Sequence, residues 1–143
     1  MKITIINGPN LNNLGIRDPG VYGNLSLDEI NEYLVSEFPD DTLDFFQSNL
    51  EGEIINKIQS LPNTSQGLII NPGGYAHTSV AIRDSLEELN IPKIEVHLSN
   101  LSSREEYRHI MLTSSACDGY LCGFKEKGYY AGIVLLKMII EQK

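Results

Sequence analysis

The feature that most constrains the fold of this chain is the regular alternation of short apolar runs with longer segments of helical periodicity. Strict alternation of strands and helices predicts one parallel sheet with helices on both faces, because each parallel connection must cross back over the sheet. The predicted strands are Ile3–Ile6, Leu43–Phe46, Gly67–Ile70, Ile94–Leu98 and Tyr120–Phe124. The predicted helices are Leu27–Glu37, Glu51–Ser60, Ser79–Leu89, a short one near Arg104–Met111, and Tyr129–Glu141.

The number of strands favours a flavodoxin-like order, although other doubly wound orders are also compatible with the alternation. The predicted fold class is therefore α/β, a three-layer α/β/α arrangement with a five-stranded parallel sheet. At 143 residues the chain is expected to form a single domain over residues 1–143, which is long enough to bury a substantial core.

Charge and cysteine content exclude several classes of function. The net charge of −8 would repel nucleic acids and anionic membranes. Cys117 and Cys122 fit neither a disulfide framework nor a zinc site, so both are expected to be reduced. The three histidines lack metal-ligand spacing, and there is no Gly-rich nucleotide motif, so we expect no metal and no cofactor.

The apolar runs are too short or too interrupted for a targeting or membrane segment. The first run ends at Ile6, which is too short for a signal peptide, and the run Ala131–Ile140 contains Lys137. We therefore expect a soluble cytoplasmic protein.

The segment Asn7–Gly23 after the first predicted strand consists mainly of turn-forming residues. Such a long loop in a small domain is usually functional or disordered, and Leu11, Leu14 and Ile16 are apolar contacts that would order this one. The loop ends at a capping box that begins at Ser26.

Polar and conformationally special residues collect after every predicted strand. In an open α/β sheet the carboxyl ends of the strands share one edge, where ligands bind. Residues far apart in sequence are therefore expected to converge there, namely Arg17, Tyr22, Asn71, His77 and His97.

Arg17 and Tyr22 lie five residues apart in the Asn7–Gly23 loop, where the guanidinium could favour the ionised form of the phenol. A phenol with a reference pKa of about 10 is ionised in only about 0.1% of molecules at neutral pH, and a nearby guanidinium favours the phenolate. A surface arginine and a loop tyrosine that only packs would give the same pattern.

Glu95 and His97 lie two residues apart in a predicted strand and therefore on one face. A buried carboxylate can fix the tautomer of an imidazole and suit it to general acid chemistry, although an isolated histidine is more often a satisfied core residue. The Pro-Gly-Gly turn that follows Asn71 could expose backbone N–H groups to an anion or could simply connect strand to helix. Arg104 and Arg108 would share one face of a short helix, where pairing with Glu105 is as good an explanation as function.

Several motifs together resemble one family, the type II 3-dehydroquinate dehydratases of the shikimate and quinate pathways. The matching motifs, in chain order, are I-N-G-P-N-L-N, G-I-R-D-P-G-V-Y-G, F-F-Q-S-N-L-E-G-E-I-I, I-I-N-P-G-G-Y-A-H-T-S-V-A-I-R-D, E-V-H-L-S-N, R-E-E-Y-R-H and G-F-K-E-K-G-Y. They cover nearly the whole chain.

The resemblance implies a flavodoxin-like lyase that removes water from 3-dehydroquinate by anti elimination, through an enolate and without a Schiff base. By resemblance Tyr22 is the base, Arg17 holds it as phenolate, and His97, oriented by Glu95, protonates the departing hydroxyl. The remaining implied roles are a water positioned by Asn10, carboxylate binding by Asn71, Ser99 and the backbone at Leu98, and hydroxyl binding by His77 and Arg108.

The resemblance also implies a homododecamer built as a tetramer of trimers, in which Asp84 reaches the site of the neighbouring subunit. Whether the pathway is biosynthetic or catabolic is left open. Six positions depart from the usual family pattern, and they are Asn13, Asp18, Gly74, Ala76, Met111 and Lys125. An alternative from another class is a non-catalytic or flavin-binding flavodoxin-like module. It is disfavoured because the loop after the first strand has no Ser or Thr before Ser26.

Overall fold

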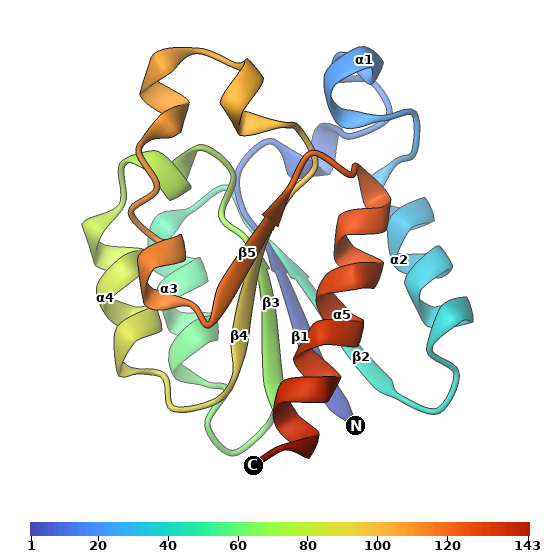
Figure 1. The fold of residues 1–143 in the computed structure, drawn as a ribbon, viewed down its shortest axis with the longest axis vertical. Coiled ribbons are helices and arrows are strands. Elements are labelled where there is room, and N and C mark those ends of the chain that lie inside the picture. Colours follow the sequence, from blue (N-terminus) through green and yellow to red (C-terminus); the bar gives the residue numbers. More distant parts are fainter.

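Five parallel strands form one sheet in the order β2-β1-β3-β4-β5 in the computed structural model, which describes residues 1–143 (Figure 1). This is the flavodoxin-like order that the sequence favoured, so the predicted α/β/α architecture is confirmed. The strands are β1 (Lys2–Asn7), β2 (Thr42–Gln47), β3 (Gly67–Asn71), β4 (Lys93–His97) and β5 (Gly119–Cys122).

Two pairs of helices cover the two faces of the sheet (Figure 1). They are α2 (Leu27–Glu37) with α5 (Glu126–Glu141), and α3 (Glu51–Gln59) with α4 (Val80–Glu88). Successive strand residues point to opposite faces, so Ile5 packs in the core under α2 and α5 while Ile6 packs in the core under α3 and α4. None of the helices is both long enough and apolar enough to cross a membrane.

The segment near Arg104–Met111 does not form the single short helix that its sequence suggested. It forms two 3-10 turns, η3 (Leu101–Ser103) and η4 (Glu106–His109), separated by Arg104, which is extended, and by Glu105. Contacts at both ends hold this path, because Arg104 donates to the Ser99 hydroxyl and the Ile110 carbonyl is hydrogen-bonded by His77. The prediction that Arg104 and Arg108 share a helix face was therefore wrong.

The loop after β1 is ordered, as predicted, but by two of the three expected apolar contacts. Leu11 and Leu14 are buried in the core beneath α2, whereas Ile16 is 86% exposed. Gly15 has a φ of 92° and turns the chain outward immediately before Ile16, which explains the error. The loop then forms the single-turn helix α1 (Pro19–Tyr22), and the predicted capping box at Ser26 begins α2.

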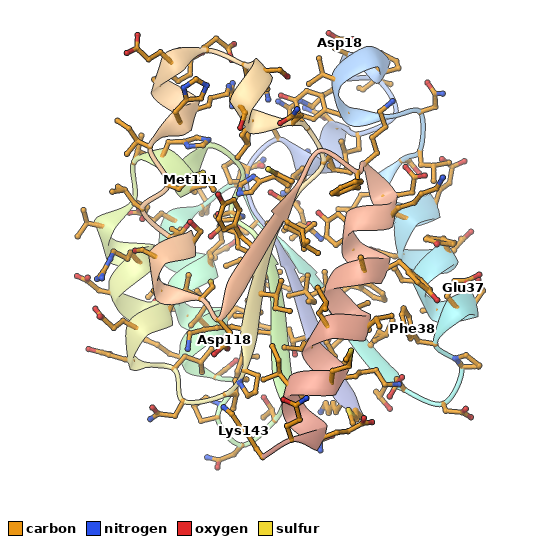
Figure 2. The ribbon with its side chains drawn as sticks, viewed as in Figure 1. Asp18, Glu37, Phe38, Met111, Asp118 and Lys143 are labelled. Carbon is orange, nitrogen blue, oxygen red and sulfur yellow. The ribbon has the colours of Figure 1, made fainter.

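The loops that follow β1 and β3 touch through their backbones at the carboxyl edge of the sheet. The Gly8 N–H donates to the Asn71 carbonyl at 2.8 Å, and a Cβ on Gly8 would lie 2.4 Å from the Pro72 carbonyl oxygen. Only glycine permits this approach. Figure 2 shows Asp18 beside α1 at this end of the molecule and Lys143 at the opposite end.

Lys125, one of the positions that depart from the family pattern, adopts a strained backbone conformation just before α5. Its φ of 52° and ψ of −138° fall in a region that glycine enters freely and other residues avoid. We expect Lys125→Gly to raise the free energy of unfolding by about 1 kcal/mol, because relief of strain outweighs the added flexibility of the unfolded chain. Urea denaturation at matched protein concentration measures this change.

Lys127→Gly is the matched control, since Lys127 is also exposed but lies within the first turn of α5. It should lower the free energy of unfolding by up to about 1 kcal/mol. Equal destabilisation by both substitutions would mean that the backbone at Lys125 is not strained.

Candidate active site

A polar cavity of about 100 Å³ opens at the carboxyl edge of the sheet, where β1, β3 and β4 end. Most of the residues that the sequence singled out line it, although they come from loops far apart in the chain. These lining residues are Asn10, Arg17, Tyr22, Asn71, His77, His97, Leu98, Ser99 and Arg108.

Arg17 and Tyr22 form a direct pair at the mouth of this cavity. The Arg17 Nη2 group donates a 2.8 Å hydrogen bond to the Tyr22 hydroxyl oxygen, and the guanidinium carbon lies 4.0 Å from the centre of the phenol ring. A positive charge that donates to a phenol oxygen stabilises negative charge on that oxygen. The side chain of Tyr22 is only partly buried, so its oxygen can reach a ligand in the cavity.

Buried hydrogen bonds fix the side chain of Asn71. Its Nδ2 donates to the Tyr129 hydroxyl at 2.9 Å, and its Oδ1 accepts from the Gly73 N–H at 3.1 Å. The Tyr129 hydroxyl in turn donates to Asn7 Oδ1 at 2.5 Å. Asn71 therefore presents a fixed amide to the cavity, with one N–H group of Nδ2 left for a ligand.

His97 and Glu95 form the pair that their spacing predicted. His97 Nε2 and Glu95 Oε1 are 2.6 Å apart, and the glutamate side chain is completely buried. Because a carboxylate only accepts, Nε2 carries a hydrogen. The one side-chain hydrogen bond of His97 is made at Nε2, so Nδ1 remains available in a ring that lines the cavity. This arrangement suits proton transfer at Nδ1.

His77 lies beside His97, with ring centres 6.2 Å apart. Its Nδ1 is 2.7 Å from the Ile110 carbonyl oxygen, which can only accept, so Nδ1 carries the hydrogen. Burial lowers the pKa of His77 below 6.5, an effect partly opposed by the Ile110 carbonyl and reinforced by the charges of His97 and Arg108. A neutral His77 offers Nε2 as an acceptor for a ligand hydroxyl.

The rim of the cavity adds backbone and cationic groups. Asn10 has a left-handed φ of 69°, and its N–H donates to Asn49 Oδ1. Leu98 and Ser99 follow β4 directly, and Arg108 is held by Glu105 through a 2.8 Å hydrogen bond. A cationic rim favours an anionic ligand in a chain whose net charge is negative.

Arg104 belongs to the cavity, although the sequence gave no reason to prefer it over ordinary surface pairing. Its Nη1 donates to the Ser99 hydroxyl at 3.2 Å, and its guanidinium carbon lies 5.2 Å from the centre of the Tyr22 ring. The available signal was its place in the R-E-E-Y-R-H motif, four residues before Arg108.

Asp84 is the predicted site residue that the structure does not bring to the cavity. It lies on α4 with its side chain 61% exposed, and its nearest charged partner is Arg83 at 3.5 Å. No hydrogen bond or ion pair of its side chain connects it to the lining residues. Glu95 also lies outside the lining, but it contacts His97 directly.

Comparison with known proteins identifies one family. The model for class II dehydroquinases matches residues 1–137. The chain is 46% identical to the 3-dehydroquinate dehydratase of Aliarcobacter butzleri, over 99% of this chain and 88% of the relative. It is 48% identical to that of Campylobacter jejuni, over 99% and 91%. The crystal structure of the type II dehydroquinase from Butyrivibrio crossotus superposes with a TM-score of 0.90 at 48% identity, over 96% of this chain and 97% of that one.

Proposed function

The chain belongs to the class II dehydroquinase family, and from its 3-dehydroquinate dehydratase activity we propose how its residues perform the reaction. The proposal is an anti elimination of water through an enolate, without a Schiff base or a metal. The observation that carries it is the 2.8 Å hydrogen bond from Arg17 to the Tyr22 hydroxyl, which prepares a phenol to act as a base.

Tyr22, as phenolate, removes a proton from the carbon next to the ketone. The electron pair moves toward the ketone oxygen and forms an enolate, which a water held by Asn10 stabilises. Arg17 supports the phenolate, and the guanidinium of Arg104 adds a second positive charge near the same ring.

His97 then protonates the departing hydroxyl. The enolate electron pair returns to form the carbon–carbon double bond, the carbon–oxygen bond breaks, and water and a conjugated enone are released. Glu95 holds His97 Nε2 and stabilises the positive charge of the protonated ring.

Binding follows from the fixed groups at the strand ends. Asn71, Ser99 and the backbone at Leu98 hold the substrate carboxylate, while His77 and Arg108 bind ring hydroxyls. Support comes from the constrained amide of Asn71 and from the acceptor that His77 presents. Asp84, exposed on α4, serves the site of a neighbouring subunit within a dodecamer of four trimers.

Tyr22→Phe removes one hydroxyl and should lower kcat by at least about a thousandfold, because the base is lost. Substrate binding and folding should change little. Formation of the enone by ultraviolet absorbance measures turnover. Tyr33→Phe, at a tyrosine of α2 outside the cavity, is the matched control and should keep full activity. Comparable turnover by the two variants would remove Tyr22 as the base.

Borohydride added during turnover should neither inactivate the enzyme nor attach substrate mass to a lysine. The reason is that none of the chain's lysines lines the cavity, so no amine is placed to form an imine with the ketone. Intact-protein mass spectrometry provides the measurement. An adduct that requires substrate would establish Schiff-base chemistry instead.

Two inactive variants should rebuild an active site between subunits if Asp84 acts on its neighbour. When Tyr22→Phe and Asp84→Ala chains are unfolded, mixed equally and reassembled, roughly a quarter of sites in a head-to-tail ring receive both intact residues. Activity should rise toward that fraction of wild type, provided that both parents are impaired.

The control for this experiment pairs Tyr22→Phe with Arg17→Ala. These two residues contact each other within one chain, so mixing should restore nothing. If the Asp84 mixture also recovers nothing, although mass analysis verifies mixed oligomers, Asp84 is an ordinary surface residue.

A further inference from the structure

The buried carboxylate of Glu95 has a second partner besides His97. Its Oε1 is bonded to His97 Nε2, and its Oε2 accepts a 2.6 Å hydrogen bond from the Thr113 hydroxyl. Glu95 and Thr113 are both 0% exposed. Each carboxylate oxygen thus accepts one short hydrogen bond. The Thr113 hydroxyl is the only donor to Oε2, the oxygen that does not contact the imidazole.

The backbone of Thr113 fixes where its hydroxyl lies. The N–H groups of Leu112 and Thr113 both approach the Ala76 carbonyl, at 2.9 and 3.4 Å, and the Thr113 carbonyl accepts from the Ala116 N–H at 3.1 Å. Threonine is also restricted at its first side-chain torsion because its Cβ is branched. The donor is therefore held in place from both directions along the chain.

The same segment holds the second imidazole of the site. The Ile110 carbonyl accepts from His77, and Thr113 donates to the glutamate that binds His97. The two rings are stacked, with an interplanar angle of 28°. Residues 110–113, which belong to no helix or strand, thus contact the partners of both histidines.

We propose that Thr113 is a positioning residue: its hydroxyl holds the Glu95 carboxylate so that Oε1 fixes His97 Nε2 and leaves Nδ1 free for the cavity. This inference rests on the proposed role of His97 as the proton donor. Without the hydroxyl, one oxygen of a buried carboxylate has no donor, and the carboxylate is free to rotate away from the imidazole.

Thr113→Val tests the proposal, because it removes the hydroxyl at nearly constant volume. We expect kcat to fall about 10- to 100-fold, with KM changed by no more than about twofold, since the lost contact orients the proton donor and does not bind substrate. Thr113→Ser keeps the hydroxyl and should restore most of kcat. If Thr113→Val does not fold, Thr113→Ala takes its place in the comparison with Thr113→Ser.

Thr4→Val is the matched control. Thr4 is also buried and hydrogen-bonded, to Ser65 at 3.1 Å, but it lies toward the other end of β1. Its replacement should leave kcat unchanged. This variant separates the loss of any buried threonine hydroxyl from the loss of the one that contacts Glu95.

A spectroscopic measurement distinguishes this inference from the role of His97. At a pH where the ring is neutral, imidazole ¹⁵N resonances should show His97 with its hydrogen on Nε2 in the wild type and a mixture of tautomers in Thr113→Val. The exposed His109 serves as the internal reference. An unchanged His97 spectrum overturns the proposal, whatever happens to kcat. A changed spectrum with unchanged kcat supports the position of Thr113 and instead removes His97 as the proton donor.

Discussion

The structure of the site depends on a buried series of hydrogen bonds that joins the side chains of Asn7, Tyr129 and Asn71 beneath it. These residues come from β1, α5 and β3, so the contacts tie the ends of two neighbouring strands to the helix that covers them. Tyr129 is completely buried, and this burial raises the pKa of its hydroxyl, which therefore keeps the proton that it donates to Asn7. Burying polar groups of this kind costs free energy unless each one is hydrogen-bonded. The three linked side chains therefore favour a single arrangement of the strand ends.

The candidate site residues fall into two groups according to the segments that carry them. Asn71 and His97 lie at or next to the ends of buried strands, where main-chain pairing with neighbouring strands fixes them. Arg17 lies instead on the partly exposed loop after β1, and Tyr22 is the last residue of the one-turn helix α1 within that loop. In the proposed mechanism, the groups that bind the substrate and donate the proton are thus positioned by the sheet. The proposed base lies on a segment that is more exposed, and such segments are less stable locally than core strands.

The strand-end part of the site could be predicted from sequence because simple rules govern it. Side chains of a β-strand alternate between its two faces, so Glu95 and His97 were expected on the same face. The alternation of strands and helices predicted a parallel sheet, whose polar strand ends share one edge. Ile16 could not be placed, because the direction of the chain after Gly15 depends on one positive φ angle. Arg104 and Thr113 were missed for another reason: their partners, Ser99 and Glu95, lie across turns whose path is set by tertiary contacts and not by local propensity.

The positions that depart from the family pattern differ in whether the main chain or the side chain makes the nearby contacts. Ala76 contributes its carbonyl to the segment that carries Thr113, Asp18 caps α1 by accepting from the Gly20 N–H, and a Cβ on Gly74 would meet nothing. Asn13 is exposed, and Met111, labelled in Figure 2, lines a cavity next to the site. At Ala76 the contact comes from the main chain and at Gly74 there is room for a side chain, whereas at Asp18 the side chain itself makes the cap. At Lys125 the substitution acts on the backbone itself, at the start of the helix that carries Tyr129.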